Sequence, residues 1–269
     1  MATCKICGNA TEKIFRRQIL TKYDVDYFQC LQCKFIQTEE PFWLQEAYQN
    51  SINIEDTGLA DRNILFVKRT SMLLYFLFAR RGKFLDYGGG YGLFTRLMRD
   101  YGFDFFWDDP HTQNLFARGF EYSREKTERF ELVTSFECFE HFQNPLKELE
   151  NMLALSDSVL FSTEIFSGTA PLPDQWGYYY FSHGQHIALY SIESLEFIAK
   201  KYKMNLYTNG KSFHLFTKKN IGNAVYGLLL KAALLGIPSL IKLAMGSRTK
   251  PDSVYSQERR NAISGKTSL

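Results

Sequence analysis

A short apolar strand followed at once by a glycine-rich loop is the feature that most constrains the fold of this chain. The segment Lys83–Tyr87 (KFLDY) is suited to a buried strand, and residues 88–92 (GGGYG) follow it directly. Residues 93–98 then form an amphipathic helical pattern. A strand, a glycine turn and a helix in this order allow the backbone to approach a nucleotide-like ligand closely. The carboxylate of Asp86 at the strand end favours a ligand with a cationic amino group over a pyrophosphate.

Short apolar segments alternate with helical segments along the rest of the chain. Besides residues 83–87, strands are expected at residues 104–110, 120–122, 131–136, 158–163, 204–208 and 211–217. Helices are expected at residues 62–81, at 146–155 and after Ser191. Such alternation predicts an α/β fold with a doubly wound, mainly parallel, seven-stranded sheet that is closed by an antiparallel hairpin around Asn209-Gly210.

Four of the five cysteines form two Cys-x-x-Cys pairs close to the N-terminus, Cys4 with Cys7 and Cys30 with Cys33. Four thiolates on two tight turns can close a tetrahedral shell around Zn²⁺ and leave no position for a catalytic water. The alternatives are unliganded thiols or a redox Cys-x-x-Cys pair, and the two pairs at ribbon spacing favour zinc over both. We therefore expect a structural zinc ribbon over residues 1–40, stabilised in large part by its metal.

Charge and targeting signals narrow the function classes. The net charge of +3, from 32 Lys+Arg against 29 Asp+Glu, does not indicate a protein that binds nucleic acid through phosphate neutralisation. The N-terminal residues MATCKICGNATEK have no apolar stretch of the kind found in secretory signals. We expect a cytoplasmic protein, with a peripheral position at the inner membrane face as an alternative.

Several of these motifs resemble those of class I S-adenosylmethionine-dependent methyltransferases, which have a Rossmann-like fold. Residues 86–92 resemble motif I of that family, the strand end at Asp109-Pro110 resembles its ribose-binding acid, and residues 134–145 are similar to its motif after strand four. With the cysteine pairs, residues 1–217 are similar to zinc-ribbon methyltransferases related to sugar C-methyltransferases and to others of surface-glycan pathways. A dehydrogenase is the alternative, but its Gly-x-Gly-x-x-Gly fingerprint is not completed here.

The resemblance implies a cofactor site for S-adenosyl-L-methionine. Asp86 would anchor its methionine portion, and Asp109 would bind its ribose, with the neighbouring Asp108 as the other candidate. The remaining cofactor-binding residues implied are Gly88, Gly90, Gly92, Phe136 and Glu137. Tyr91 departs from the family pattern because it brings a large ring into the loop.

An aromatic segment at residues 166–190 is the candidate substrate lid. Aromatic faces with a few polar tips suit a sugar ring or another flat ligand, although some of these rings are expected only to pack the lid. From this segment we expect Trp176, Tyr179 and His183 to contact substrate. Aromatic residues make up 16% of the whole chain, and some of them lie in this lid.

A histidine is the expected general base. Methyl transfer is an SN2 displacement that mainly requires alignment, but an oxygen or carbon nucleophile must also lose a proton. His186 aligns with the histidine of the family's Glu-His pair and is the first candidate, and His141 is the second. Gln185 stands where that pair has its acid and cannot accept a proton, which weakens the case for C-methylation.

The chain becomes markedly apolar at residues 221–245. Lys231, Gly236, Pro238 and Lys242 interrupt the run, so it is not an uncharged span of bilayer length. Peripheral contact with an anionic membrane is one interpretation. A helix pair that packs on the domain, or on a second subunit in a homodimer, is the other. Residues 247–269 are expected to be a polar, mobile tail.

These expectations define a four-part chain: zinc ribbon at 1–40, linker or lid and helix at 41–82, methyltransferase domain at 83–218, and apolar helical segment with polar tail at 219–269. The expected activity is S-adenosylmethionine-dependent methylation of a small polar acceptor, a sugar or nucleotide sugar of surface-glycan biosynthesis. Methylation of RNA and a non-catalytic cofactor-binding scaffold are the alternatives.

Overall fold

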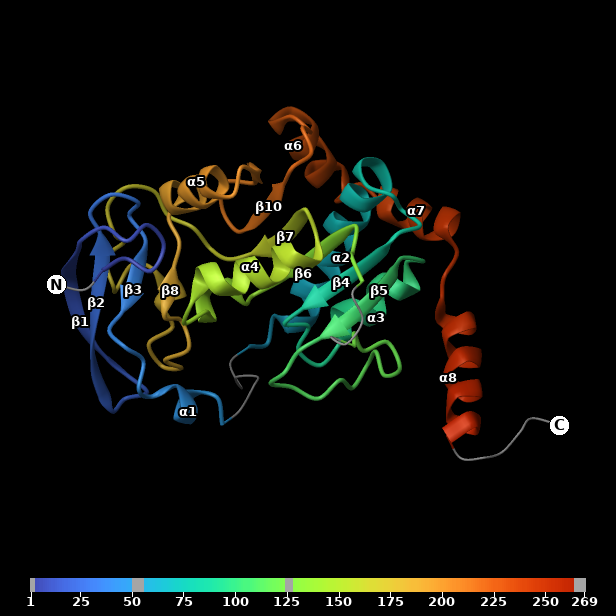
Figure 1. Cartoon of the computed structure of the whole chain (residues 1–269), viewed down its shortest axis with the longest axis horizontal. Coiled ribbons are helices and arrows are strands. Elements are labelled where there is room, and N and C mark those ends of the chain that lie inside the picture. The colour runs from blue at the N-terminus through green and yellow to red at the C-terminus, as the bar shows by residue number, and fades with distance from the viewer. Residues whose placement is uncertain (1–2, 50–55, 124–127, 264–269) are drawn as a thin grey trace. The chain divides into compact units, whose positions relative to one another are not determined.

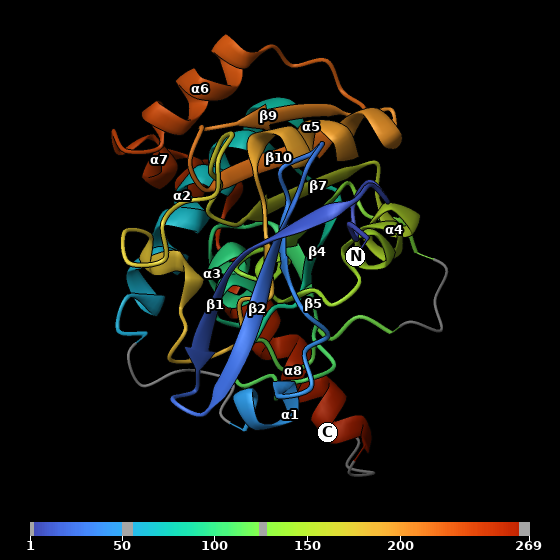
Figure 2. The ribbon, with the colours of Figure 1, turned by 90° about the vertical axis from the view of Figure 1, so that its left-hand side faces the viewer.

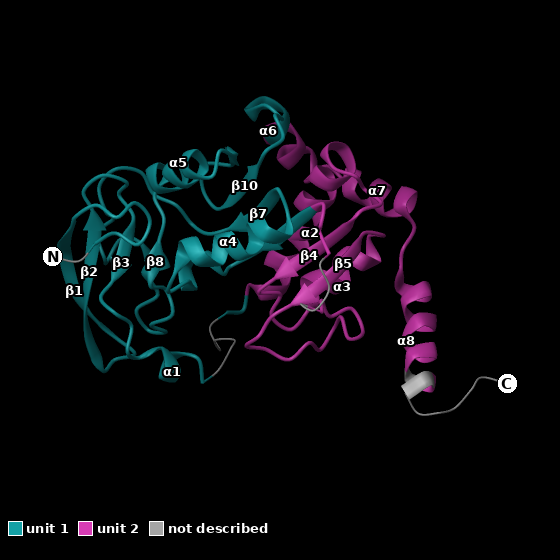
Figure 3. Ribbon diagram, in the orientation of Figure 1, with its two compact units in different colours: residues 1–57, 132–226 teal, residues 58–131, 227–269 magenta. Residues whose placement is uncertain are grey.

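The computed structural model describes residues 3–49, 56–123 and 128–263 (Figure 1). Within these ranges the chain forms two compact units, each built from two separate stretches of sequence. Unit 1 consists of residues 1–57 and 132–226, and unit 2 of residues 58–131 and 227–269 (Figure 3).

The N-terminal part of unit 1 is an antiparallel sheet in the order β1-β2-β3-β8. Its strands are β1 (Thr11–Ile19), β2 (Tyr23–Cys30), β3 (Ile36–Thr38) and β8 (Ala188–Leu189). The first two strands form a long hairpin that Figure 2 shows in blue. β8 comes from the end of the aromatic lid and pairs with β3, so backbone hydrogen bonds attach the lid to this sheet.

Unit 1 also contains four strands of the central sheet. These are β6 (Leu132–Ser135), β7 (Ser158–Ser162), β9 (Asn205–Thr208) and β10 (Phe213–Thr217). β6 and β7 are parallel, whereas β10 is antiparallel to both β7 and β9, which confirms the expected terminal hairpin. The helices of unit 1 are α1 (Leu44–Ala47), α4 (Pro145–Leu155) and α5 (Ile192–Lys201).

α5 begins where the sequence predicts. The Ser191 hydroxyl accepts a hydrogen bond from the Ser194 N–H at 3.0 Å, and the Ser194 hydroxyl accepts one from the Ser191 N–H at 3.0 Å. This reciprocal capping box satisfies two backbone donors at the helix start. The Ser191 hydroxyl also donates to the Cys33 carbonyl at 2.7 Å, so the cap joins α5 to the cysteine turns.

Unit 2 contains the strand, glycine loop and helix recognised in the sequence. β4 (Lys83–Tyr87) runs parallel to β5 (Asp104–Asp108), and α3 (Leu93–Asp100) follows the loop and packs on β5. α2 (Leu59–Leu77) also packs on α3 and ends earlier than expected. Phe78, the residue after it, is extended and only 8% exposed, so burial of its ring draws the chain out of the helix before Arg80-Arg81.

The expected third strand at residues 120–122 is reduced to one bridge. Glu121 pairs in parallel with Trp107, flanked by two backbone hydrogen bonds of 2.8 Å to Trp107. The Glu121 carboxylate accepts from the Gly119 N–H at 2.9 Å, which bends the chain into a turn just before this point. In the described residues this strand is therefore reduced to a single pairing beside β5, and the sheet does not gain the seventh strand that the sequence predicts.

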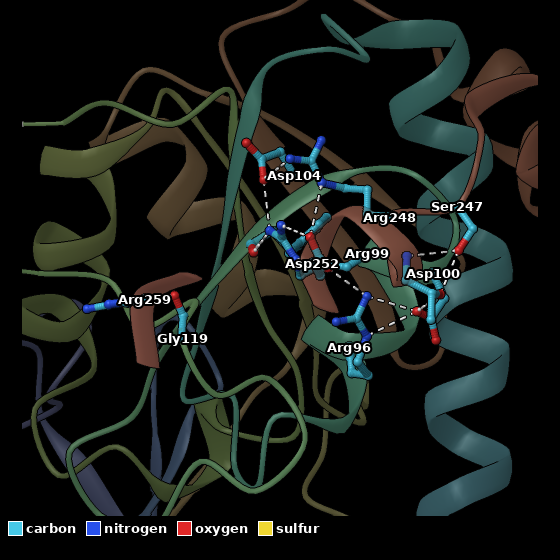
Figure 4. Close-up of polar contacts among 11 residues, drawn as sticks. Arg96, Arg99, Asp100, Asp104, Gly119, Ser247, Arg248, Asp252 and Arg259 are labelled. Atoms are coloured by element: carbon cyan, nitrogen blue, oxygen red, sulfur yellow. Dashed lines mark hydrogen bonds and ion pairs between the residues drawn. The ribbon is translucent and has the colours of Figure 1, made fainter. Parts of the chain in front are cut away.

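Three C-terminal helices complete the described residues: α6 (Asn223–Ala232), α7 (Ile237–Met245) and α8 (Thr249–Ile263). In the described part of the chain no single helix is both long and apolar enough to cross a bilayer, and α6 and α7 reach that length only together, with a bend of 88° between them. The expectation of a mobile tail is wrong for residues 249–263, because they form α8. Figure 4 shows how Asp252 of α8 pairs with Arg99 and Arg96 of α3.

Candidate functional site

The glycine loop of unit 2 has a backbone that glycine adopts most easily. Gly88, Gly90 and Gly92 have φ of 70°, 53° and 83°, which lie in the left-handed region that side chains disfavour. Gly89 has no such φ, but a Cβ there would meet Trp107 Cδ1 at 2.7 Å and Asp86 Oδ2 at 2.8 Å. The sequence alone does not indicate that residue 89 must be glycine, because the need comes from packing against Trp107 of the next strand.

Hydrogen bonds from the neighbouring strand fix the path of this loop. The N–H groups of Gly88 and Gly89 donate to the Asp108 carbonyl at 2.8 and 3.3 Å. The Gly90 carbonyl accepts from Trp107 Nε1 and from the Thr112 hydroxyl, both at 2.8 Å. The loop is thus a rigid backbone cradle, the kind of surface that a nucleoside-containing cofactor can approach.

The two acids predicted to hold the cofactor have different hydrogen-bond partners. Asp86 is 2% exposed, and its Oδ2 accepts from the Thr95 hydroxyl at 2.8 Å. Asp109 accepts from three backbone N–H groups, those of Gly90 at 2.9 Å, His111 at 2.8 Å and Thr112 at 3.1 Å. Asp109 therefore positions the glycine loop and its own turn, a task that the sequence alone did not indicate.

Phe136 and Glu137, the other predicted cofactor residues, belong to unit 1 and follow β6. Phe136 stacks on Phe213 with ring centroids 5.7 Å apart. Glu137 has a φ of 53°, an uncommon conformation for a residue with a side chain. Its N–H donates to the Ser162 hydroxyl at 2.7 Å, and that hydroxyl donates to Glu137 Oε1 at 2.5 Å. These two hydrogen bonds hold Glu137 in a strained backbone conformation, and such strain often marks a functional site.

The two candidate bases come together in unit 1. The ring centroids of His141 and His186 are 5.0 Å apart with an interplanar angle of 81°. Nδ1 of His141 lies 3.1 Å from the Gln185 carbonyl, and Nδ1 of His186 lies 2.6 Å from the Tyr178 carbonyl. A carbonyl oxygen only accepts, so each Nδ1 carries the hydrogen and each neutral ring presents Nε2 as its acceptor.

Burial sets the charge of both rings. It lowers the pKa of His141, and it lowers the pKa of His186 further, with the charge of His141 as the next cause. Desolvation disfavours the imidazolium form, so both histidines are neutral at physiological pH and can accept a proton.

Glu140 is the functional candidate that sequence reasoning passed over. It is 1% exposed, and one ligand atom from each of Glu140, His141 and His186 lies within 4.8 Å of the others. Its adjacency to His141 in the sequence was visible, but its approach to His186 depends on the fold. One carboxylate and two imidazoles can either move a proton or hold a transition-metal ion.

The aromatic lid divides into rings near the histidines and rings in the core. Tyr178 and Tyr180 lie 4.6 and 5.1 Å from His186 between ring centroids, and His183 stacks on Tyr180 at 5.2 Å. Trp176 donates from Nε1 to Glu164 Oε1 at 2.7 Å.

Tyr179 has a different position from the other predicted substrate residues. It is 1% exposed, it stacks on Phe181, and its hydroxyl donates to the Pro171 carbonyl at 2.9 Å. Its ring also packs edge-on against Phe15 and Tyr27 of the N-terminal sheet. This ring therefore joins the lid to that sheet.

The four N-terminal cysteines form one compact cluster. Their sulfur atoms lie within 4.8 Å of one another, with Cys4 and Cys33 3.6 Å apart and Cys7 and Cys30 3.3 Å apart. These separations exceed a disulfide bond of about 2 Å. They approach the roughly 3.8 Å between sulfurs that tetrahedral Zn–S bonds of about 2.3 Å require. The donor set therefore fits a structural zinc ion.

No curated protein sequence matches the chain. Among solved structures, CalO1, a methyltransferase of calicheamicin biosynthesis in its SAH-bound form, is 12% identical with a TM-score of 0.47, over 66% of this chain and 60% of that one. The 1,6-didemethyltoxoflavin-N1-methyltransferase of Burkholderia thailandensis is also 12% identical, with a TM-score of 0.46, over 76% of this chain and 97% of that one.

The coverage of the first similar structures is partial. The chain spans 60% of the length of CalO1 and 62% of the length of TnmH, which is 14% identical with a TM-score of 0.47 over 66% of this chain. The family is shown by sequence instead. Residues 61–208, more than half of the 269 residues, match the family described as a methyltransferase domain. The match confirms the expected α/β class I fold with its central, mostly parallel sheet. The chain belongs to this methyltransferase-domain family.

Proposed function

We propose that this protein is an S-adenosylmethionine-dependent methyltransferase whose acceptor is a small polar molecule, a sugar or nucleotide sugar of surface-glycan biosynthesis. The observation that carries the proposal is the pair of half-buried, neutral histidines, His141 and His186, whose Nδ1 atoms face backbone carbonyls and whose Nε2 atoms are free to accept a proton. S-adenosylmethionine supplies, when bound, a methyl group on a positively charged sulfur. The chain must then hold the cofactor, hold the acceptor and remove one proton.

The residues of unit 2 that would hold the cofactor are those of the glycine cradle. Gly90 has a positive φ and no atom within 4 Å of the position of a Cβ, so a cofactor can approach the backbone there, and the buried Asp86 carboxylate offers a negative partner for its amino group. Asp109, or Asp108 beside it, would face the ribose hydroxyls. Phe136 and the strained Glu137, which belong to unit 1, remain predicted cofactor residues on the resemblance alone.

The proton of the acceptor would go to His186 Nε2, with His141 as the second candidate. Accepting it creates an imidazolium in a buried setting, which needs a compensating negative charge. Gln185 cannot supply one, and its side-chain amide donates to the Ala47 carbonyl at 2.7 Å. Glu140 lies close to both histidines and can supply the carboxylate that Gln185 lacks. An acceptor with an acidic hydroxyl or carbon would thus meet a base even without the family's Glu-His pair.

The acceptor would lie against the aromatic rings beside His186. Tyr178, Tyr180 and His183 form a group around that ring, with Trp176 5.4 Å from Tyr178 between ring centroids. Such faces pack on the C–H surface of a sugar ring, and the hydroxyl tips give it hydrogen bonds.

The decisive experiment incubates the full chain with methyl-labelled S-adenosylmethionine and separate pools of nucleotide sugars, glycans and RNA. We expect label in a sugar-containing product, and loss of that label with His186→Asn. Label in RNA alone would contradict the proposal and favour an RNA methyltransferase. Binding of S-adenosylhomocysteine by calorimetry without label in any pool would favour a non-catalytic scaffold.

A further inference from the structure

The end of unit 2 exposes apolar side chains where a soluble helix normally carries polar ones. Five leucines of α6, α7 and their connection are 63–79% exposed: Leu228, Leu234, Leu235, Leu240 and Leu243. Large apolar side chains that are exposed together in one segment mark an interaction site more often than a chance feature of the surface. We call these five residues the leucine surface.

The leucine surface is not the inner face of the helices. In α7 the buried residues are Pro238, Ile241 and Met245, and α7 packs on α2 within the same unit. Leu240 and Leu243, which are 65% and 79% exposed, therefore point away from that contact. α7 is apolar on both sides, and packing on the domain accounts for one side only.

The charged residues of the segment that carries the leucine surface all have the same sign. Lys231 and Lys242 lie within the two helices, Lys250 follows, and no Asp or Glu occurs between residues 196 and 252. Lysine stems can lie along an apolar surface while their ammonium groups reach a polar boundary. A surface of leucines bordered by lysines is complementary to a layer that is apolar inside and negative at its face.

The lengths of α6 and α7 indicate how this segment would contact a bilayer. α6 has 10 residues and α7 has 9, so at about 1.5 Å per residue each is roughly 15 Å long, half of the 30 Å hydrocarbon core. The bend of 88° prevents the two helices from forming one straight span. The pair therefore suits a position in the membrane interface and does not suit a crossing.

A second copy of the chain fits the surface less well. A twofold dimer through the leucine surface would place the same patch on both sides of the interface. Lys231 and Lys242 of each copy would then meet lysines, with no acidic residue of this segment to pair with them. From leucine exposure, single-sign charge and helix length, we propose that the leucine surface docks unit 2 on an anionic lipid bilayer. This inference does not depend on the identity of the methyl acceptor.

Vesicle binding by the full chain tests the proposal. We expect co-sedimentation with vesicles of two parts phosphatidylcholine to one part phosphatidylglycerol, and much weaker binding to phosphatidylcholine alone. The double variant Leu235→Glu with Leu243→Glu should bind at least roughly tenfold more weakly, because two apolar side chains no longer leave water. Lys231→Gln should weaken binding to the anionic vesicles and leave the weak binding to neutral vesicles unchanged.

Val254→Glu is the matched control, because Val254 is 54% exposed on α8 and lies outside the leucine surface. It should bind like the unchanged chain, and the thermal midpoints of all variants should agree. The proposal is overturned if the unchanged chain binds neither vesicle, or if the double variant binds as well as the control. A dimer in the absence of lipid that Leu235→Glu converts to a monomer would also overturn it, in favour of a second copy.

Discussion

His141 and His186 lie with their rings 5.0 Å apart and nearly perpendicular, and each directs Nδ1 at a backbone carbonyl. The arrangement fixes the tautomer of both rings without using either Nε2. One of the two carbonyls belongs to Gln185, the residue that occupies the position of the missing acid. The backbone carbonyl of Gln185 thus orients His141. In our proposal the carboxylate of Glu140 supplies the negative charge that the Gln185 side chain lacks.

Replacement of His186 should remove the proton acceptor. For His186→Asn we expect kcat to fall by about 10²- to 10⁴-fold with smaller changes in KM, the range associated with a lost general base. Since His111 is exposed, His111→Asn is the control and should keep the activity. Retention of kcat within a few-fold in His186→Asn, together with a large loss in His141→Asn, would transfer the role to His141.

The pH profile of the unchanged protein follows from the same burial. The pKa of His186 is lowered, so the neutral, proton-accepting form persists below the ordinary value of about 6.5. Activity should therefore remain level on acidification through pH 6.5 and decline only at lower pH, as the ring becomes protonated. A profile of kcat/KM whose acid limb has its midpoint above 6.5 would show that a different group, or an exposed histidine, is the base.

Elements whose signals lie in neighbouring residues could be predicted from the sequence. Features that depend on contacts between residues far apart in the chain could not. The strand–glycine loop–helix around Asp86 and the capped start of α5 at Ser191 each depend on neighbouring residues, and both formed as expected. The pairing of β8 with β3, the burial of Tyr179 and the approach of Glu140 to His186 join residues far apart in the chain. α8 was missed because its polar sequence has no apolar stripe, and it is held through Asp252 and the salt bridges of that residue.

Gly89→Ala should disrupt the cofactor cradle while leaving the fold intact. The new methyl group would meet Trp107 Cδ1 at 2.7 Å and Asp86 Oδ2 at 2.8 Å, so the loop or Asp86 must shift. We expect affinity for S-adenosylhomocysteine, measured by calorimetry, to fall at least roughly tenfold, with a stability cost of about 1–3 kcal/mol. Gly177→Ala is the control, because nothing lies within 4 Å of the added Cβ. Equal affinities of the two variants would mean that the loop does not hold the cofactor.

Metal analysis should find about one zinc ion per chain, held by the four N-terminal cysteines. Cys30→Ser should lose that zinc and lower the thermal midpoint, because Cys30 is buried in the cluster. Cys138→Ser, which changes the remaining cysteine, should keep it. A second metal ion that remains in Cys30→Ser and disappears in His186→Asn would show that Glu140, His141 and His186 bind metal and do not form a proton-transfer site.

The salt bridges that hold α8 should make a large and pH-dependent contribution to stability. Arg99 is 2% exposed, its Nε and Nη2 donate to the two oxygens of Asp252 at 2.8 and 2.7 Å, and its Nη1 donates to Asp104 at 2.8 Å (Figure 4). Asp252→Asn leaves a buried guanidinium without its bidentate partner, which costs about 3–5 kcal/mol in comparable pairs. The control is Asp157→Asn, which breaks the exposed pair with Lys218 and should cost less than about 1 kcal/mol.

The stabilisation by Asp252 should also depend on pH, because the pKa of its carboxyl group differs between the folded and unfolded chain. Burial alone would raise the pKa of Asp252, but the hydrogen bonds and charges of Arg99 and Arg96 outweigh it and lower the pKa. A lowered pKa in the folded state gives stability that is complete above the unfolded value of about 3.9 and is lost as pH falls through the folded value. The difference in unfolding free energy between the unchanged chain and Asp252→Asn, measured by urea titration, should therefore be constant from pH 7 to 5 and shrink below about pH 4. A difference that is small at pH 7, or that grows on acidification, would show that Asp252 does not hold α8 through its charge.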